Sequence, residues 1–409
     1  MVQPKLRFKC EDGTSYPEWE ALTLGDKFAF KNGINASREA FRTAGIHCIG
    51  VSDIIKCLPI LADNVIGTVA ISDDEIEKNK VNYGDILFQR SSETQEDIGH
   101  ASVYIDKRPS VYNGFVICGK PDKLFYNPVF LHNALQIYKV RKQTVSLGAG
   151  AQHYNIGHEG LAQVKVNIPC LEEQQKIADF LSTVDEVIAQ SEVEIQDLEQ
   201  QKKAAMQKIF LREVRFGRED GTEFPEWEKV KLRKILYEHK ETCEKDGTYE
   251  HISLTKEGVV PKTERYERDF LVMDDSKKYR VTHYNDICYN PANLKFGVIC
   301  RNRYGDGIFS PIYVTFKVQE NYLPHFIEMI VTRNNFIHYA LRFQQGTVYE
   351  RMAVSPEDLL SIDVLVPCLE EQQKIADFLS AYDEAISYAK QELDKWKELK
   401  KGLLQQMFV

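Results

Sequence analysis

Four short stretches of the chain carry side chains suited to reading DNA bases. They are residues 88–95 (FQRSSETQ), 150–155 (GAQHYN), 289–297 (YNPANLKFG) and 342–351 (RFQQGTVYER). Arg, Lys, Asn, Gln and Ser/Thr match base edges in the major groove, and aromatic rings can contact bases or sugars. Nearby Gly, Asn and Pro favour loops. The pattern predicts a nucleic-acid interface built from loops. For any single residue, a position in an ordinary solvated loop is as good an explanation as a DNA contact.

The candidate DNA-contacting residues have polar or aromatic side chains, and all except Lys256 lie in these four stretches. They are Gln89, Arg90, Ser91, Ser92, Gln95, Gln152, His153, Tyr154, Lys256, Tyr289, Asn290, Asn293, Lys295, Arg342, Gln344, Gln345, Thr347, Tyr349 and Arg351. We expect Arg and Gln to contact bases, and neighbouring Lys and Ser to position the DNA backbone.

The sequence shows no recognisable catalytic or metal site. It has no GxxxxGK[ST] phosphate loop. Residues 148–157 (GAGAQHYNIG) lack the GxGxxG spacing, and residues 289–293 (YNPAN) lack the second proline and the aromatic of an amino-methyltransferase loop. Nine cysteines form no CxxC pair and no zinc spacing, so we predict buried free thiols and neither a disulfide framework nor a metal. An enzyme with an unrecognised active site is a remote alternative.

Composition permits DNA binding without indicating it. The chain has 409 residues and a net charge of -9, and most of the excess acid lies in residues 170–210 and 368–409. The length suits two to four domains. The N-terminus lacks the apolar run of a signal peptide, and no stretch of about 18 apolar residues could span a bilayer. We therefore expect a cytoplasmic protein without a membrane partner.

Two internal repeats organise the chain. The fourteen residues PCLEEQQKIADFLS occur at 169–182 and again at 367–380, and RFKCEDGTSYPEWE at 7–20 returns as RFGREDGTEFPEWE at 215–228. Between these markers each copy holds a variable body. A duplication of one unit is the simplest explanation.

The segments after the two prolines are predicted to be long helices. Apolar residues recur at alternating spacings of four and three, from Ile177 to Ile209 and from Ile375 to Met407. Lys202 and Lys400 occupy equivalent positions in this heptad pattern, which is typical of a coiled coil. Packing of each helix on its own body alone is the less favoured alternative.

The variable bodies contain short β-branched and aromatic runs, together with one helical stretch each. The predicted fold class is therefore mixed α/β (α+β), with two globular domains joined by two long helices and an internal two-fold pseudo-repeat. We predict four segments: a lead-in and first domain at 1–168, a helix at 169–212, a linker and second domain at 213–366, and a helix at 367–409.

The whole pattern resembles the specificity subunit of Type I restriction-modification systems. The motif Pro-x-Leu-x-Glu-Gln-x-x-Ile-x-x-Phe-Leu before each long helix is its most specific element, and the likeness covers essentially the full chain. The resemblance implies two target recognition domains and two spacer helices that pair antiparallel. It also implies that this subunit is not an enzyme and holds no cofactor.

The resemblance further implies partners. They are double-stranded DNA, two modification subunits that methylate adenine N6 with S-adenosylmethionine, and restriction subunits that use ATP and Mg²⁺. The duplicated helix starts are the predicted docking residues for the modification subunits: Glu172, Glu173, Gln174, Gln175, Glu370, Glu371, Gln372 and Gln373.

A helix of about 40 residues is roughly 60 Å long, close to 18 base pairs of DNA. An antiparallel pair would therefore act as a ruler between two different half-sites. The sequence leaves two other readings open: a methylation-only complex without restriction subunits, and a duplicated coiled-coil adaptor that binds protein instead of DNA.

Overall fold

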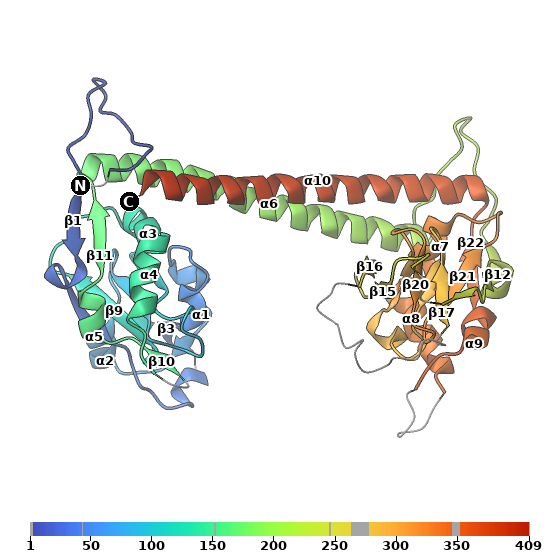
Figure 1. Ribbon diagram of the computed structural model, residues 1–409, viewed down its shortest axis with the longest axis horizontal. Coiled ribbons are helices and arrows are strands. Elements are labelled where there is room, and N and C mark those ends of the chain that lie inside the picture. Colours follow the sequence, from blue (N-terminus) through green and yellow to red (C-terminus); the bar gives the residue numbers. More distant parts are fainter. Residues whose placement is uncertain are drawn as a thin grey trace. The chain divides into compact units, whose positions relative to one another are not determined.

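The computed structural model describes residues 3–42, 44–150, 153–244, 247–262, 278–345 and 352–408. The chain forms two compact units. The first comprises Met1–Ile195 with Ala389–Val409, and the second comprises Gln196–Tyr388. Each unit contains a globular body and a stretch of each long helix (Figure 1). The four-segment division expected from the sequence separates helices from bodies, and it stays a prediction.

The first body contains short strands and short helices. The strands are β1 (Glu20–Thr23), β2 (Phe28–Asn32), β3 (Ile46–Ile49), β4 (Thr68–Val69), β5 (Ile86–Gln89), β6 (Ser91–Ser92), β7 (Ala101–Val103), β8 (Val111–Tyr112), β9 (Val116–Pro121), β10 (Tyr154–Asn155) and β11 (Lys165–Ile168). The helices are α1 (Val51–Ile54), α2 (Asp73–Asn79), α3 (Pro128–Gln136), α4 (Tyr138–Ser146) and α5 (His158–Ala162), and α6 (Leu171–Phe210) follows.

The second body has a similar inventory. Its strands are β12 (Glu228–Lys231), β13 (Leu236–Glu238), β14 (Thr242–Cys243), β15 (Ile252–Leu254), β16 (Val259–Pro261), β17 (Tyr279–Thr282), β18 (Ile287–Tyr289), β19 (Ile299–Arg301), β20 (Gly307–Phe309), β21 (Val314–Val318) and β22 (Asp363–Val366). Its helices are α7 (Pro324–Val331), α8 (Asn334–Ala340) and α9 (Pro356–Ser361), and α10 (Leu369–Met407) follows.

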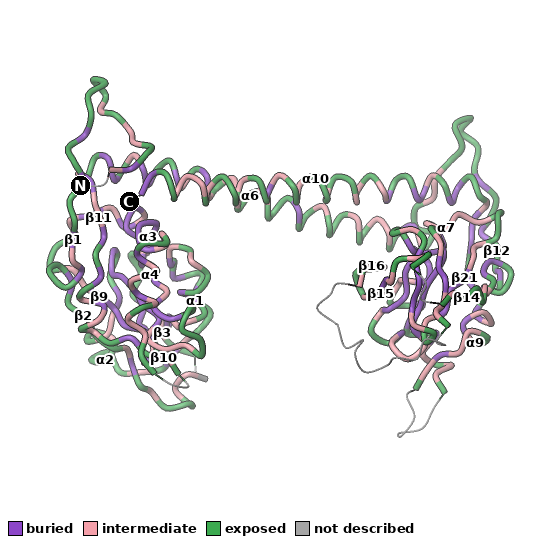
Figure 2. The backbone as a smooth tube through the Cα atoms, in the orientation of Figure 1, coloured by how far each residue is buried: buried purple, intermediate pink, exposed green. Residues whose placement is uncertain are grey.

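A four-stranded antiparallel sheet with the same connectivity lies at the centre of each body. The strand order is β2-β9-β5-β7 in the first and β13-β21-β18-β19 in the second. Phe88 pairs with Ile117, and Tyr289 pairs with Val314. This register aligns β5 with β18 and β9 with β21. The buried residues concentrate on these strands (Figure 2). The predicted mixed fold with an internal repeat is confirmed.

The long helices pair antiparallel within each unit. In the first unit Asp185 bonds Lys400 at 2.6 Å and Glu192 bonds Lys397 at 2.7 Å, so the numbers rise along α6 as they fall along α10. In the second unit Lys202 bonds Asp383 at 2.5 Å. Every position of the predicted heptad seam is buried or half-buried. The predicted coiled coil is confirmed, and its two seam lysines each pair with an aspartate on the opposite helix.

Aromatic residues at the helix ends complete the cores of the bodies. Phe408, just after α10, lies 6.0 Å from the Trp19 ring and 5.3 Å from the Phe130 ring. Phe210, at the end of α6, stacks on the Phe326 ring at 5.7 Å and meets the Trp227 ring edge-on at 6.0 Å. Each body therefore contacts the start of one long helix and the end of the other.

Candidate nucleic-acid interface

In the first unit, the two predicted DNA-contacting stretches come together. Strand β6 pairs with β10, which sets Ser92 opposite Tyr154 and Ser91 opposite Asn155. The Ile156 amide donates to the Arg90 carbonyl at 3.0 Å. Residues 88–95 and 153–155, far apart in sequence, are thus neighbours at the end of the central strand β5.

In the second unit the equivalent contact joins the stretch 289–297 to Val354, which lies three residues beyond the other stretch. The Val354 amide donates to the Pro291 carbonyl at 3.2 Å. The Tyr289 hydroxyl donates to the Val354 carbonyl at 3.1 Å. Pro291 follows β18 as Arg90 follows β5, and Val354 occupies the repeat position of Ile156. The duplicated scaffold therefore places corresponding loops side by side in both bodies.

An antiparallel bridge flanks the second stretch in each unit. Ala149 pairs with Asn155, and Gln345 pairs with Ala353. Four of the predicted contact residues, Gln152, Thr347, Tyr349 and Arg351, lie outside the described residues.

The remaining candidates differ in exposure. Gln95, His153, Lys256, Lys295, Arg342 and Gln345 are exposed, and Ser91, Ser92, Tyr154, Asn293, Gln344 and Arg90 are half-buried. Some are already engaged. Gln344 donates to the Met352 carbonyl at 3.0 Å and Gln345 donates to Asp358 at 3.1 Å, so both bonds lie beside the bridge between Gln345 and Ala353. Contact between any of these residues and DNA stays a prediction.

Three predicted contact residues are buried, which corrects the sequence-based assignment. Tyr289 is 0% exposed and stacks on Phe316 with ring centroids 5.7 Å apart. Asn290 is buried, and its side-chain oxygen accepts from two amides of its own turn, at 3.0 and 3.2 Å. Gln89 is buried and donates to the Ser91 carbonyl at 3.0 Å. Polar side chains at the end of a strand often bond the turn that follows, as Gln89 and Asn290 do here. The Tyr289 hydroxyl instead joins β18 to Val354.

Arg90 is also largely occupied within the chain. Its guanidinium donates to the Gly114 carbonyl at 3.2 Å, and its amide donates to the Phe115 carbonyl at 2.9 Å. These two hydrogen bonds of Arg90 join the turn before β9 to the loop after β5. The predicted base contact of Arg90 stays a prediction.

The structure reveals exposed apolar side chains that the sequence reading missed. Phe115 precedes β9 and is 64% exposed, and Ile312 precedes β21 and is 57% exposed. Strand register makes these two positions equivalent. Both lie beside the loop that follows the central strand. An isolated Phe or Ile in a turn gives no sequence signal, and both are exposed at the same point of two divergent bodies.

Two lysines flank an exposed aromatic ring in the second unit. Phe296 is 54% exposed, and the ammonium groups of Lys295 and Lys256 lie 4.9 and 5.8 Å from its ring centroid. Such a pairing offers phosphate contacts beside an apolar surface. Phe296 was within a predicted stretch, YNPANLKFG, but only its polar neighbours were singled out.

The predicted docking residues divide into two groups. Glu173, Gln174, Glu371 and Gln372 are 0–1% exposed, which corrects their assignment to a partner surface. Arg7 donates to Glu173 through two nitrogens, at 3.0 and 2.7 Å, and Arg215 does the same to Glu371 at 3.3 and 2.9 Å. The pKa values of Arg7 and Arg215 are raised, chiefly by these bonds. Removing either arginine would leave a buried charge unpaired, at a cost of about 3–5 kcal/mol.

The buried glutamines join each long helix to its body. Gln174 donates to the Pro169 carbonyl at 2.8 Å and accepts from the Asn127 amide at 2.9 Å. Gln372 repeats both bonds, with the Pro367 carbonyl at 2.9 Å and the Leu323 amide at 2.9 Å. The identity of the duplicated motif therefore has an internal structural cause. By contrast, Glu172, Gln175, Glu370 and Gln373 are exposed.

Comparison with known proteins identifies the family. Residues 17–200 and 310–397 match the Type I restriction modification DNA specificity domain. The chain belongs to this family. The Type I specificity chain is 26% identical over 419 residues to the putative type I restriction enzyme MjaX specificity subunit of Methanocaldococcus jannaschii, covering 97% of this chain and 94% of that protein. It is 24% identical over 331 residues to the MjaVIII specificity subunit of the same organism, covering 74% of each.

Solved structures show the same fold. The S subunit from M. genitalium aligns with a TM-score of 0.57 at 14% identity, over 100% of this chain and 99% of that one. A chain solved in work on complex assembly and conformational transition of the type I R-M system aligns with a TM-score of 0.57 at 13% identity, over 96% and 98%. The protein is thus a non-catalytic Type I specificity subunit with DNA-recognition domains.

Several other features of this specificity subunit bear on its chemistry. All nine cysteines are free thiols, but only Cys48, Cys118, Cys288 and Cys300 are buried, so the predicted burial holds for part of the set. Across the described ranges, no group of three or more His, Cys, Asp or Glu could hold a metal ion. Within the same ranges, no helix combines the length and apolarity needed to cross a membrane.

Proposed function

We propose that the chain recognises a bipartite, asymmetric DNA site, with one half-site per unit. The observation that carries the proposal is the duplicated contact that joins the two loops, Ile156 to Arg90 in the first unit and Val354 to Pro291 in the second. One scaffold thus presents two different sets of side chains. Because base contacts specify sequence, different side chains on equivalent loops imply different half-sites.

The exposed residues within these loops supply the proposed chemistry. Gln95 and His153 lie in the first unit, and Lys295 and Arg342 lie in the second. Lysine and arginine can neutralise phosphates, and amides and guanidinium groups can pair with base edges. The apolar Phe115 and Ile312 add contacts with thymine methyl groups or sugars.

Docking of two modification subunits follows from the repeated exposed residues at the helix starts. Glu172 and Gln175 on α6 correspond to Glu370 and Gln373 on α10. Leu171 and Leu369, also equivalent, are 56% and 46% exposed. One kind of partner can therefore meet the same surface twice. In this proposal the modification subunits bring S-adenosylmethionine for adenine N6 methylation, and restriction subunits bring ATP and Mg²⁺.

The proposal is tested by selection from a random DNA pool with the chain reconstituted with its modification subunits. We expect two short motifs separated by a gap of constant length. Enrichment of a single continuous motif would contradict one half-site per unit. No enrichment, with the partners bound, would favour a protein adaptor. Recovery of the motif without any restriction subunit in the genome would favour the methylation-only complex.

A further inference from the structure

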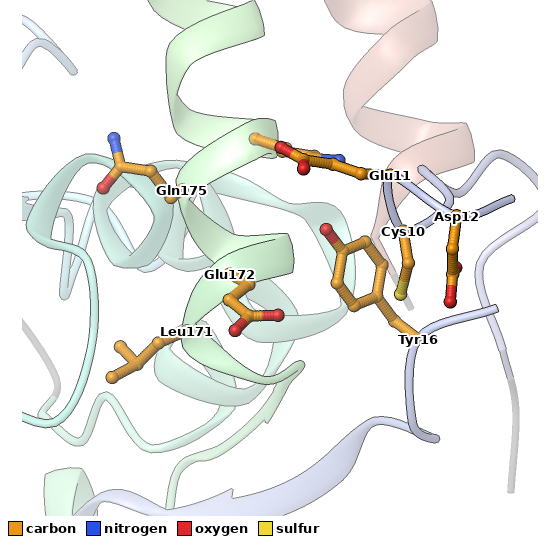
Figure 3. Close-up of a pocket in the computed structure, with 8 residues that line it drawn as sticks. Cys10, Glu11, Asp12, Tyr16, Leu171, Glu172 and Gln175 are labelled. Atoms are coloured by element: carbon orange, nitrogen blue, oxygen red, sulfur yellow. The ribbon is translucent and has the colours of Figure 1, made fainter. Parts of the chain in front are cut away.

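A groove lies in both units between the lead-in hairpin, which is residues 9–15 in the first unit and 217–223 in the second, and the start of the long helix. In the first unit it has a volume of about 770 Å³, and its lining includes Cys10, Asp12, Tyr16, Glu172 and Lys176. Figure 3 shows Glu172 projecting from α6 toward the Tyr16 ring, with Cys10 beside the other side of that ring. In the second unit the corresponding groove has a volume of about 370 Å³.

Each residue that lines the second groove occupies the repeat position of a residue in the first, with two changes of type, whereas Leu171 and Gln175 line the first groove alone. The second groove is lined by Arg218, Glu219, Asp220, Phe224, Glu370 and Lys374. A phenylalanine replaces Tyr16, and an arginine replaces Cys10. The lysine on the helix is conserved in function, since Lys176 lies 5.5 Å from the Tyr16 ring centroid and Lys374 lies 5.7 Å from that of Phe224.

Cys10 and Arg218 stand at the same backbone position. The Cys10 amide donates to the Thr14 carbonyl at 2.9 Å, and the Arg218 amide donates to the Thr222 carbonyl at 2.8 Å. In both hairpins a glycine with positive φ follows, Gly13 at 85° and Gly221 at 82°. The backbone is therefore the same, and the two grooves differ chiefly in this one side chain.

Arg218 shows which chemistry the groove accepts. Its guanidinium carbon lies 5.2 Å from the Phe224 ring centroid, and its Nε lies 3.5 Å from the Glu370 carboxylate. A planar cation thus fills the space between an aromatic ring and a carboxylate, which is favourable for arginine in particular. In the first unit the ring and the carboxylate are present as Tyr16 and Glu172, but Cys10 supplies no cation, and the groove is larger.

Charge in the first groove also favours a cation. Glu11, Asp12 and Glu172 line it with a single lysine, Lys176. The pKa of Asp12 is lowered by its bonds to the Thr14 hydroxyl and amide, which keeps this carboxylate ionised. An incoming guanidinium would therefore meet a net negative surface beside an aromatic ring.

We propose that the groove of the first unit receives an arginine side chain from a protein partner, in the place that the chain's own Arg218 fills in the second unit. The identity of this partner as a modification subunit rests on the docking proposed above. It makes the two docking surfaces unequal, with the first unit depending on an arginine of the partner and the second supplying its own.

The groove itself is tested on the full-length chain without partners. The probe is the tripeptide acetyl-Gly-Arg-Gly-amide, with its lysine analogue for comparison, followed by saturation-transfer NMR. We expect the arginine tripeptide to bind the wild type and to bind Cys10→Arg at least fivefold more weakly. Cys10→Ser, which leaves the groove open, should bind as the wild type does. Arg218→Cys should add a second site.

Equal binding of the tripeptide by Cys10→Arg and Cys10→Ser would overturn the groove assignment. Because arginine already occupies the matching position in the second unit, Cys10→Arg is expected to fold normally, which its thermal transition would verify. In the reconstituted complex, Cys10→Arg should bind the modification subunit several-fold more weakly than Cys10→Ser. Equal affinities there would overturn the partner assignment, while the recovered DNA motif would test the proposed function separately.

Discussion

Single side chains in the loops divide into those that hold the loops and those free to contact DNA. Gln89, Asn290 and Tyr289 have side chains suited to reading bases but are buried. Gln89 and Asn290 bond within their own turns, and the Tyr289 hydroxyl donates to the Val354 carbonyl. Phe115 and Ile312 have no polar group, yet they are exposed beside those turns. Sequence composition selected these loops, and their contact with DNA stays a prediction. It could not assign their side chains, because exposure depends on the register of strands far away in the chain.

Truncation of the exposed apolar residues should therefore alter recognition. Phe115→Ala in the assembled complex should weaken DNA binding by about 1–2 kcal/mol, roughly tenfold, because the ring loses apolar contact with base or sugar. Selection from random DNA should show relaxed preference in one half-site alone. Phe115→Leu keeps an apolar contact and serves as the control. An unchanged affinity and motif for Phe115→Ala would remove this residue from the interface.

A buried histidine gives the first unit a pH dependence. Burial lowers the pKa of His132 to about 3. Its ring contacts the Cys57 carbonyl at 3.2 Å and the Ser102 hydroxyl at 3.4 Å. In the unfolded chain the pKa is about 6.5, so below that pH the unfolded state binds a proton that the folded state does not. The contribution of His132 to the free energy of unfolding is therefore full above pH 6.5 and is lost progressively as the pH falls toward 3.

The corresponding prediction concerns the slope of stability against pH. Between about pH 6 and 4, the free energy of unfolding of the first unit should fall by up to about 1.4 kcal/mol per pH unit because of this one group. His132→Gln should remove that contribution, measured by urea unfolding at several pH values. The exposed His153→Gln is the control and should keep the wild-type slope. An identical slope for the two variants would show that His132 is not buried in its neutral form.

At the scale of elements, the long helices form a coiled coil, and their first turns also bond to the globular bodies. The heptad spacing predicted both helices and their coiled coil, because period and length are properties of the local sequence. The reason for the identical PCLEEQQ motifs was not local. It depends on Arg7 reaching Glu173 and on Gln174 reaching the first turn of α3, contacts that only the tertiary structure brings together.

The ion pairs across the helices should fix their antiparallel register. Asp185 and Lys400 are 28% and 18% exposed, so their attraction is only partly screened. Asp185→Lys and Lys400→Asp should each destabilise the first unit by about 1 kcal/mol, since each places like charges together. The double exchange should recover most of that loss in urea unfolding. Additive losses in the double variant would show that the two residues do not interact.

For the whole molecule, duplication explains both what the two units share and how they differ. The sequence repeat predicted two bodies of one fold, and the four-stranded sheets confirm it with the same strand order. Each compact unit includes part of both long helices, and the four-segment division expected from the sequence stays a prediction. A helix shared between two cores carries no boundary signal, since its heptad pattern continues without interruption.

The central claim is that each unit specifies one half of a bipartite site. Methylation mapping of the host genome tests it most directly, with the gene intact, deleted, or altered by Phe115→Ala or Ile312→Ala. We predict methylated adenines in two short motifs separated by a constant gap, all lost on deletion, with each substitution relaxing a different half. A single motif, or the same half changed by both substitutions, would contradict the account.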